Sequence, residues 1–249
     1  MGNNKISTII SIHIPKTAGT TLSHYLRNHF NVFADNEFSA KLAQLYQLYS
    51  SYPNGSGVGI AARKWMHIGF IESILSMDST IKKTKDYDCI HGHFNVMKYR
   101  FYPNAKFITF VREPLERAIS HYYYWKKLYE NGYEDLYLNY LFERNMGLNE
   151  FLFLKSFRNY QSLYLNGISL KKIDFLGISD NGFSEDVKYL FGTVLNHPLK
   201  DVEILKINVT DYTKNIENID VDAFRKFHRK DYRIYEYALE KRKMRNCIA

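Results

Sequence analysis

The residues best suited to chemistry in this sequence are a lysine, a glycine and three threonines in the segment HIPKTAGTT, residues 13–21. An apolar, β-branched run precedes the segment and a helical pattern follows it, which predicts a strand-to-helix loop. The first N–H groups of a helix lack intrahelical partners and attract anions, and Lys16 adds a full charge. Gly19 permits close backbone approach, while hydroxyl donors are supplied by Thr17, Thr20 and Thr21. These features predict a phosphate site; the alternative is a Thr-capped turn with a solvated lysine. Because Lys16 precedes the glycine, the loop is not the common P-loop.

A second group of polar residues lies in VREPLERAIS, residues 111–120. Arg112 ends a predicted strand, and Ser120 lies on the helix that Pro114 is expected to begin. A guanidinium can bind a phosphate with two N–H groups while a hydroxyl donates a further hydrogen bond. The alternative for Arg112 is a salt bridge at a strand end, and Arg117 suits a structural ion pair equally well.

Two histidines, His91 and His93, follow a short predicted strand in the segment HGHF. A hydroxyl nucleophile must lose its proton as it attacks, and histidine has a pKa suited to accept that proton near neutral pH. The pair is therefore a candidate for general-base chemistry.

Together these segments resemble the paired 5′-phosphosulfate and 3′-phosphate signatures of sulfotransferases. They are most similar to the family that includes heparan sulfate 2-O-sulfotransferase and related carbohydrate sulfotransferases. Looser similarity continues in the family's order through NYQSLYLNG, FLGISDNGFSEDVKYL, INVT and KDYRIYEYA, so it covers most of the chain.

This resemblance implies a P-loop-like sulfotransferase fold and the donor 3′-phosphoadenosine-5′-phosphosulfate. Lys16 would contact the phosphosulfate and help the leaving phosphate depart. The 5′ side of the donor would be lined by Thr17, Ala18, Gly19, Thr20 and Thr21. Arg112 and Ser120 would hold the 3′-phosphate.

The resemblance also assigns roles on the acceptor side. His93 would be the general base, with His91 beside it in a supporting role. A substrate-side role is expected for Arg63 and His67, in the region where the family often has a histidine.

Strands and helices alternate along the chain and would position these residues. Strands are predicted over 6–14, 87–90, 106–111, 173–179 and 202–207. The main helices are predicted from 19 onward, over 114–129, 148–165 and 184–195, and from 221 with a break near 230–231. This alternation predicts an α/β fold with a central parallel sheet flanked by helices. No linker divides the sequence, so a single domain over 1–249 is expected.

The formal net charge of +8 and the pI near 9.2 favour an anionic ligand. Two cysteines, Cys89 and Cys247, cannot form a disulfide framework, and no Cys/His spacing suggests zinc. No apolar run approaches the ~20 residues of a membrane span. A cytoplasmic location is expected if the chain is complete, and the Golgi lumen if a membrane anchor has been removed.

The sequence therefore predicts transfer of a sulfuryl group to a hydroxyl acceptor, expected to be a carbohydrate or glycoconjugate, by in-line displacement with a histidine base. The sulfuryl group carries less negative charge than a phosphoryl group, so no metal is expected. Nucleic acid is not an expected partner. Two alternatives stay open: a metal-dependent kinase or glycosyltransferase, and a non-catalytic module that binds a polyanion through the basic C-terminal helices.

Overall fold

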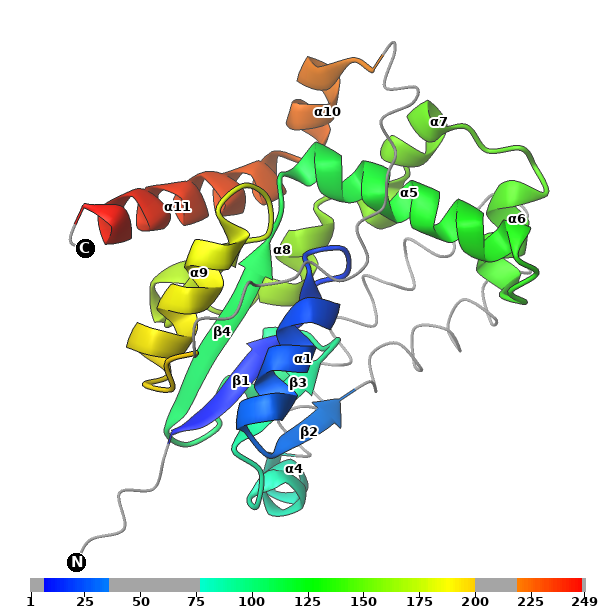
Figure 1. Cartoon of the computed structure of the whole chain (residues 1–249). Helices are drawn as coiled ribbons and strands as arrows, with labels where there is room; N and C mark the ends of the chain where they lie inside the picture. Colours follow the sequence, from blue (N-terminus) through cyan, green and yellow to red (C-terminus); the bar gives the residue numbers. More distant parts are fainter. Residues whose placement is uncertain (1–6, 36–76, 200–218, 248–249) are drawn as a thin grey trace, which may run out of the picture.

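A five-stranded parallel sheet forms the centre of the molecule in the computed structural model, which describes residues 7–35, 77–199 and 219–247 (Figure 1). The strand order is β2-β3-β1-β4-β5, and all four neighbouring pairs are parallel. The strands are β1 (Thr8–Ile12), β2 (Val32–Asp35), β3 (Cys89–Gly92), β4 (Ala105–Val111) and β5 (Phe175–Ile178). The predicted α/β class with a parallel sheet is confirmed.

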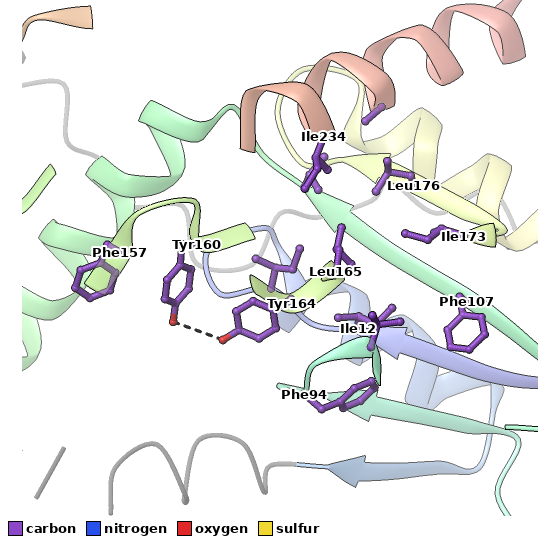
Figure 2. Packing of buried hydrophobic residues seen from close by; sticks show 14 of the residues in the cluster. Ile12, Phe94, Phe107, Phe157, Tyr160, Tyr164, Leu165, Ile173, Leu176 and Ile234 are labelled. Atoms are coloured by element: carbon purple, nitrogen blue, oxygen red, sulfur yellow. Dashed lines mark hydrogen bonds between the residues drawn. The ribbon is translucent and has the colours of Figure 1, made fainter. Parts of the chain in front are cut away.

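Helices cover both faces of this sheet because successive strand residues point to opposite sides. Ile9 packs in one cluster with Leu22 and Leu26 of α1 (Gly19–His29) and with Val187 of α9 (Phe183–Tyr189). Ile10 packs in the opposite cluster. That second cluster includes residues of α8 (Tyr160–Leu165) and α11 (Arg229–Asn246), and Figure 2 shows its labelled members Ile12, Tyr164, Leu165 and Ile234. Because β1 is covered on both sides, it carries buried isoleucines on both of its faces, Ile9 on one and Ile10 and Ile12 on the other.

The long helix α5 (Pro114–Glu130) follows β4 directly. Glu113 begins α5 by accepting a hydrogen bond from Glu116 N (2.8 Å), and Pro114 occupies the first turn, where a missing N–H costs little. Figure 1 shows α5 leading from β4 towards α6 (Leu136–Phe142) and α7 (Leu148–Leu152). The remaining elements are α4 (Met77–Thr84), α10 (Val221–Phe227) and the short turns η1 (Val96–Tyr99), η2 (Lys155–Phe157), η3 (Leu170–Lys172) and η4 (Leu190–Val194).

Several predicted boundaries differ from the structure. The helix predicted over 148–165 is three pieces, α7, η2 and α8. Leu154 (ψ 127°) leaves the helical conformation before η2, and Asn159 (φ 56°) is left-handed immediately before α8. The break in the C-terminal helical region lies at His228 and not near 230–231. Strand β2 was not predicted, and the strand predicted over 202–207 lies outside the described residues.

The carboxyl ends of the parallel strands bring the three segments that contain the predicted site residues to one edge of the sheet. Ile12 of β1 is in register with Gly92 of β3 on one side and with Thr109 of β4 on the other. The residues that follow these three strands therefore share one edge, which in open parallel sheets is where ligands bind.

Candidate functional site

The loop between β1 and α1 (residues 13–18, the β1–α1 loop) has an unusual backbone conformation. Lys16 (φ 70°) and Ala18 (φ 60°) both lie in the left-handed region, which is uncommon for residues other than glycine. Between them, Thr17 is buried and its hydroxyl donates to the carbonyl of Ile14 (2.8 Å). Strain of this kind persists where the surrounding structure enforces it, and it concentrates at functional sites.

Ala18 precedes the first residue of α1 and cannot cap the helix with its side chain. Ala18, the N-cap residue of α1, makes no side-chain capping hydrogen bond. The alternative of a Thr-capped turn is therefore wrong. Thr20 is exposed and Thr21 is buried in the first turn of the helix. An uncapped helix start beside a lysine suits an anionic ligand.

One face of α5 joins the β1–α1 loop to the second predicted segment. Glu116, Ser120 and Tyr124 are spaced by four residues and so lie along one side of the helix. The guanidinium of Arg112 lies 3.6 Å from Glu116 Oε2 at one end, and Lys16 Nζ lies 4.1 Å from the ring centroid of Tyr124 at the other. The rise from Glu116 to Tyr124 is about 12 Å at ~1.5 Å per residue. Buried Ser120 sits midway, one turn from each.

The cations at this face raise the local positive potential. Burial lowers the pKa of Lys16 to about 8, and the charges of Arg112 and Arg117 contribute. Arg117 is buried and hydrogen-bonds to Nδ1 of His121 (3.1 Å), with its guanidinium 4.6 Å from the ring centroid of Tyr160. Burial also lowers the pKa of Arg117, and its Nε has no hydrogen-bond partner within the described part of the chain. Such a concentration of positive charge favours binding of an anion.

Arg112 is oriented by two residues, Asp180 and Gln161, that were not among the predicted site residues. Its Nε donates to Asp180 Oδ1 (3.2 Å), and the second oxygen of Asp180 accepts from Glu113 N (2.7 Å). Gln161 contacts the Arg112 backbone twice, accepting from its N–H (2.9 Å) and donating to its carbonyl (2.8 Å). The strand-end salt bridge proposed as an alternative is thus present. Asp180 follows β5, so its place at the carboxyl edge of the sheet was a usable signal; Gln161 offered none.

The two predicted histidines occupy different surroundings. His91 is buried within β3, and its Nδ1 lies 2.9 Å from Ser11 Oγ on β1. Burial lowers the pKa of His91 to about 3, and its Nε2 has no hydrogen-bond partner in the described ranges. His93 lies just beyond the strand. Its Nδ1 donates to the carbonyl oxygen of His13 (2.8 Å), since that oxygen can only accept. Neutral His93 therefore keeps its lone pair on Nε2.

A third histidine, which was not predicted as a site residue, lies between His93 and α1. The ring of His13 stacks on His93 with centroids 4.0 Å apart and on His91 with centroids 5.2 Å apart. A Cβ added to Gly19 would come within 1.8 Å of His13 Nε2, so the glycine is required for this contact. His13 thus connects the histidines to the start of α1.

Arg63 and His67 lie outside the described residues. Within residues 7–35, 77–199 and 219–247, no group of three or more His, Cys, Asp or Glu side chains is arranged to hold a metal ion. In the same ranges, no helix combines the length and apolar character needed to cross a membrane.

Comparison with protein families identifies the class to which this fold and site correspond. Residues 4–166, well over half of the chain, match the sulfotransferase family. The chain belongs to the sulfotransferase family. Searches of curated proteins and of solved structures each gave no match.

Proposed function

We propose that this chain transfers a sulfuryl group from 3′-phosphoadenosine-5′-phosphosulfate to a hydroxyl group of a carbohydrate or glycoconjugate, with His93 as general base. The observation that carries this proposal is the hydrogen bond from His93 Nδ1 to the His13 carbonyl (2.8 Å), which leaves Nε2 as the proton acceptor. Burial lowers the pKa of His93, although this hydrogen bond opposes the effect, so the neutral form is available at neutral pH.

The described residues fit such a donor because they offer two separate cationic positions. Lys16 and the uncapped start of α1, from Thr17 to Thr21, would bind the phosphosulfate side. Arg112 and Ser120 would bind the 3′-phosphate, with Asp180 fixing the plane of the guanidinium. When bound, the donor supplies an activated sulfuryl group attached to a phosphate leaving group. Lys16 would then stabilise the charge that develops on that phosphate.

The acceptor would bind with its hydroxyl facing Nε2 of His93. As the oxygen attacks, Nε2 takes its proton, and the hydrogen bond from Nδ1 to the His13 carbonyl becomes charge-assisted and stronger. His91 would support this arrangement from β3, where it stays neutral because of its burial.

A thermal-shift assay with adenosine phosphates tests the donor site. Adenosine 3′,5′-bisphosphate should stabilise the protein more than AMP does, because AMP lacks the 3′-phosphate. The Arg112→Ala variant should lose this preference, while the exposed Arg144→Ala variant, which lies just beyond α6, should keep it. Equal stabilisation by AMP and the bisphosphate in the unmodified protein would show that the 3′-phosphate assignment is wrong.

A transfer assay with labelled donor and a panel of hydroxyl acceptors tests the base. His93→Ala should lower transfer by about 10²–10⁴-fold, the usual contribution of general-base catalysis, while binding of the bisphosphate persists. Loss of bisphosphate binding in this variant would instead indicate a structural histidine.

The same assay separates the alternative functions. A kinase or glycosyltransferase that depends on a metal would lose activity in EDTA, whereas the proposed sulfotransferase would not. A polyanion-binding module would bind its ligand in a salt-dependent manner that Lys16→Ala leaves unchanged.

A further inference from the structure

We propose that His13 is a positioning residue for the general base, and that its ring holds the imidazole of His93 in place and shields it from water. This inference rests on the proposed function, which assigns the base to His93. The ring of His13 lies between the two predicted histidines, His91 and His93, and Gly19 at the start of α1.

Hydrogen bonds of the His13 backbone with Gly92 and His93 fix the position of His13 beside the end of β3. Its N–H donates to the Gly92 carbonyl (2.8 Å), and its own carbonyl accepts from His93 Nδ1 (2.8 Å). The register of β1 and β3 pairs Ile12 with Gly92, so the residue after each strand meets its counterpart at the sheet edge. His13 and His93 are consequently neighbours by strand pairing, although 80 residues separate them.

The ring of His13 fills the space between His93 and the start of α1. On one side it stacks on His93, with ring centroids 4.0 Å apart and planes inclined by 26°. On the other side it lies so close to Gly19 that any Cβ there would overlap with its Nε2, Cδ2 and Cε1 atoms. A ring held on both sides cannot turn freely, and it limits how His93 can move.

This contact has a chemical consequence for the base. Removing water from a histidine disfavours its charged form and lowers its pKa. The pKa of His93 is lowered in this way, and the ring of His13 covers one of its faces. Among the described residues, the titratable groups that interact with His93 are His13 beyond β1, His91 on β3 and His121 on α5. Burial lowers the pKa of His13 well below its ordinary value, and the nearby groups His93, His91 and Lys16 lower it further. A neutral ring therefore faces His93.

The test compares two substitutions at position 13 by NMR titration of the His93 side chain, which requires no turnover. His13→Ala opens the covered face to water while the backbone hydrogen bond to His93 remains. We expect the titration midpoint of His93 to rise by about one pH unit. His13→Leu keeps an apolar group over the ring, and its midpoint should stay close to that of the unmodified protein.

Activity provides the second readout. A positioning role predicts that the acid limb of the kcat/KM profile moves with the His93 midpoint. On the acid side, His13→Ala should therefore lose about tenfold in activity for each pH unit by which that midpoint rises. His13→Leu should keep the acid limb in place. Binding of adenosine 3′,5′-bisphosphate serves as the check that each variant is folded with an intact donor site.

The outcomes distinguish this inference from the function on which it rests. An unchanged His93 midpoint in folded His13→Ala would overturn the positioning role. A midpoint that rises while the acid limb of activity stays fixed would support the contact but remove His93 as the base. If His13→Ala does not fold, the titration of His13→Gln decides, because its smaller contact area predicts a smaller rise in the same direction, and no rise overturns the inference.

Discussion

The ammonium group of Lys16 lies 4.1 Å from the centre of the Tyr124 ring, a contact between the β1–α1 loop and the third turn of α5. Lys16 reaches this ring from a backbone with φ 70°. The same face of α5 carries buried Ser120 one turn earlier. The ring contact therefore holds the lysine on the face of α5 that also carries the serine that we assign to the second phosphate.

Removing the Tyr124 ring should weaken donor binding. A cation–π contact at an exposed site contributes about 0.5–1 kcal/mol, so Tyr124→Ala should lower the affinity for adenosine 3′,5′-bisphosphate about two- to fivefold. Tyr124→Phe keeps the ring and should bind as the unmodified protein does. Isothermal titration calorimetry measures both variants. Tighter binding by Tyr124→Ala would contradict this expectation and indicate that the ring holds Lys16 away from the donor.

Donor binding should also depend on pH through Lys16. Burial together with Arg112 and Arg117 lowers the pKa of Lys16 to about 8, so the charge on this lysine is present below that pH and is lost above it. Affinity for the bisphosphate should be constant near pH 7 and fall by up to about tenfold per pH unit above pH 8. Lys16→Arg keeps its charge throughout this range and should bind without the decline. A parallel decline in Lys16→Arg would assign the titration to another group.

The sequence predicted the parts of the site that depend on neighbouring residues in the chain, and it missed the contacts between distant segments. The β1–α1 loop and the start of α5 were predicted correctly because glycine and proline mark their turns within a few residues. The partners of Arg112 could not be found in this way, since Gln161 lies 49 residues away and Asp180 lies 68 residues away. His13 was missed because it continues an apolar strand pattern, and only strand register reveals that it faces His93. Strand β2 was missed because its residues, VFAD, are too few to show a period.

Gln161 should be needed for the orientation of Arg112. Its amide satisfies both the N–H and the carbonyl of Arg112, and a buried backbone group without a partner costs about 1–3 kcal/mol. Gln161→Met should therefore lower the free energy of unfolding by at least this amount. Because Arg112 contacts only the 3′-phosphate in our proposal, the variant should also lose affinity for the bisphosphate while affinity for AMP is unchanged. An equal loss for both nucleotides would contradict a specific effect on Arg112.

His228 should make stability fall in mild acid. It links α7 to the start of α8, with Nδ1 accepting from Asn159 N (3.1 Å) and Nε2 donating to the Leu152 carbonyl (3.0 Å). Burial lowers its pKa to about 4, compared with about 6.5 when unfolded, so its contribution is fully present above pH ~6.5 and is lost as pH falls through 4. Protonation removes the acceptor for Asn159.

Urea unfolding tests this prediction. The free energy of unfolding of His228→Gln should be lower by about 1–3 kcal/mol at pH 7, and it should depend less on pH between pH 6.5 and 4. The pH dependence of stability that remains in this variant includes a contribution from His91, because burial lowers the pKa of His91 to about 3. Exposed His24→Gln is the matched control and should keep the full dependence; an unchanged slope in His228→Gln would show that other groups account for it.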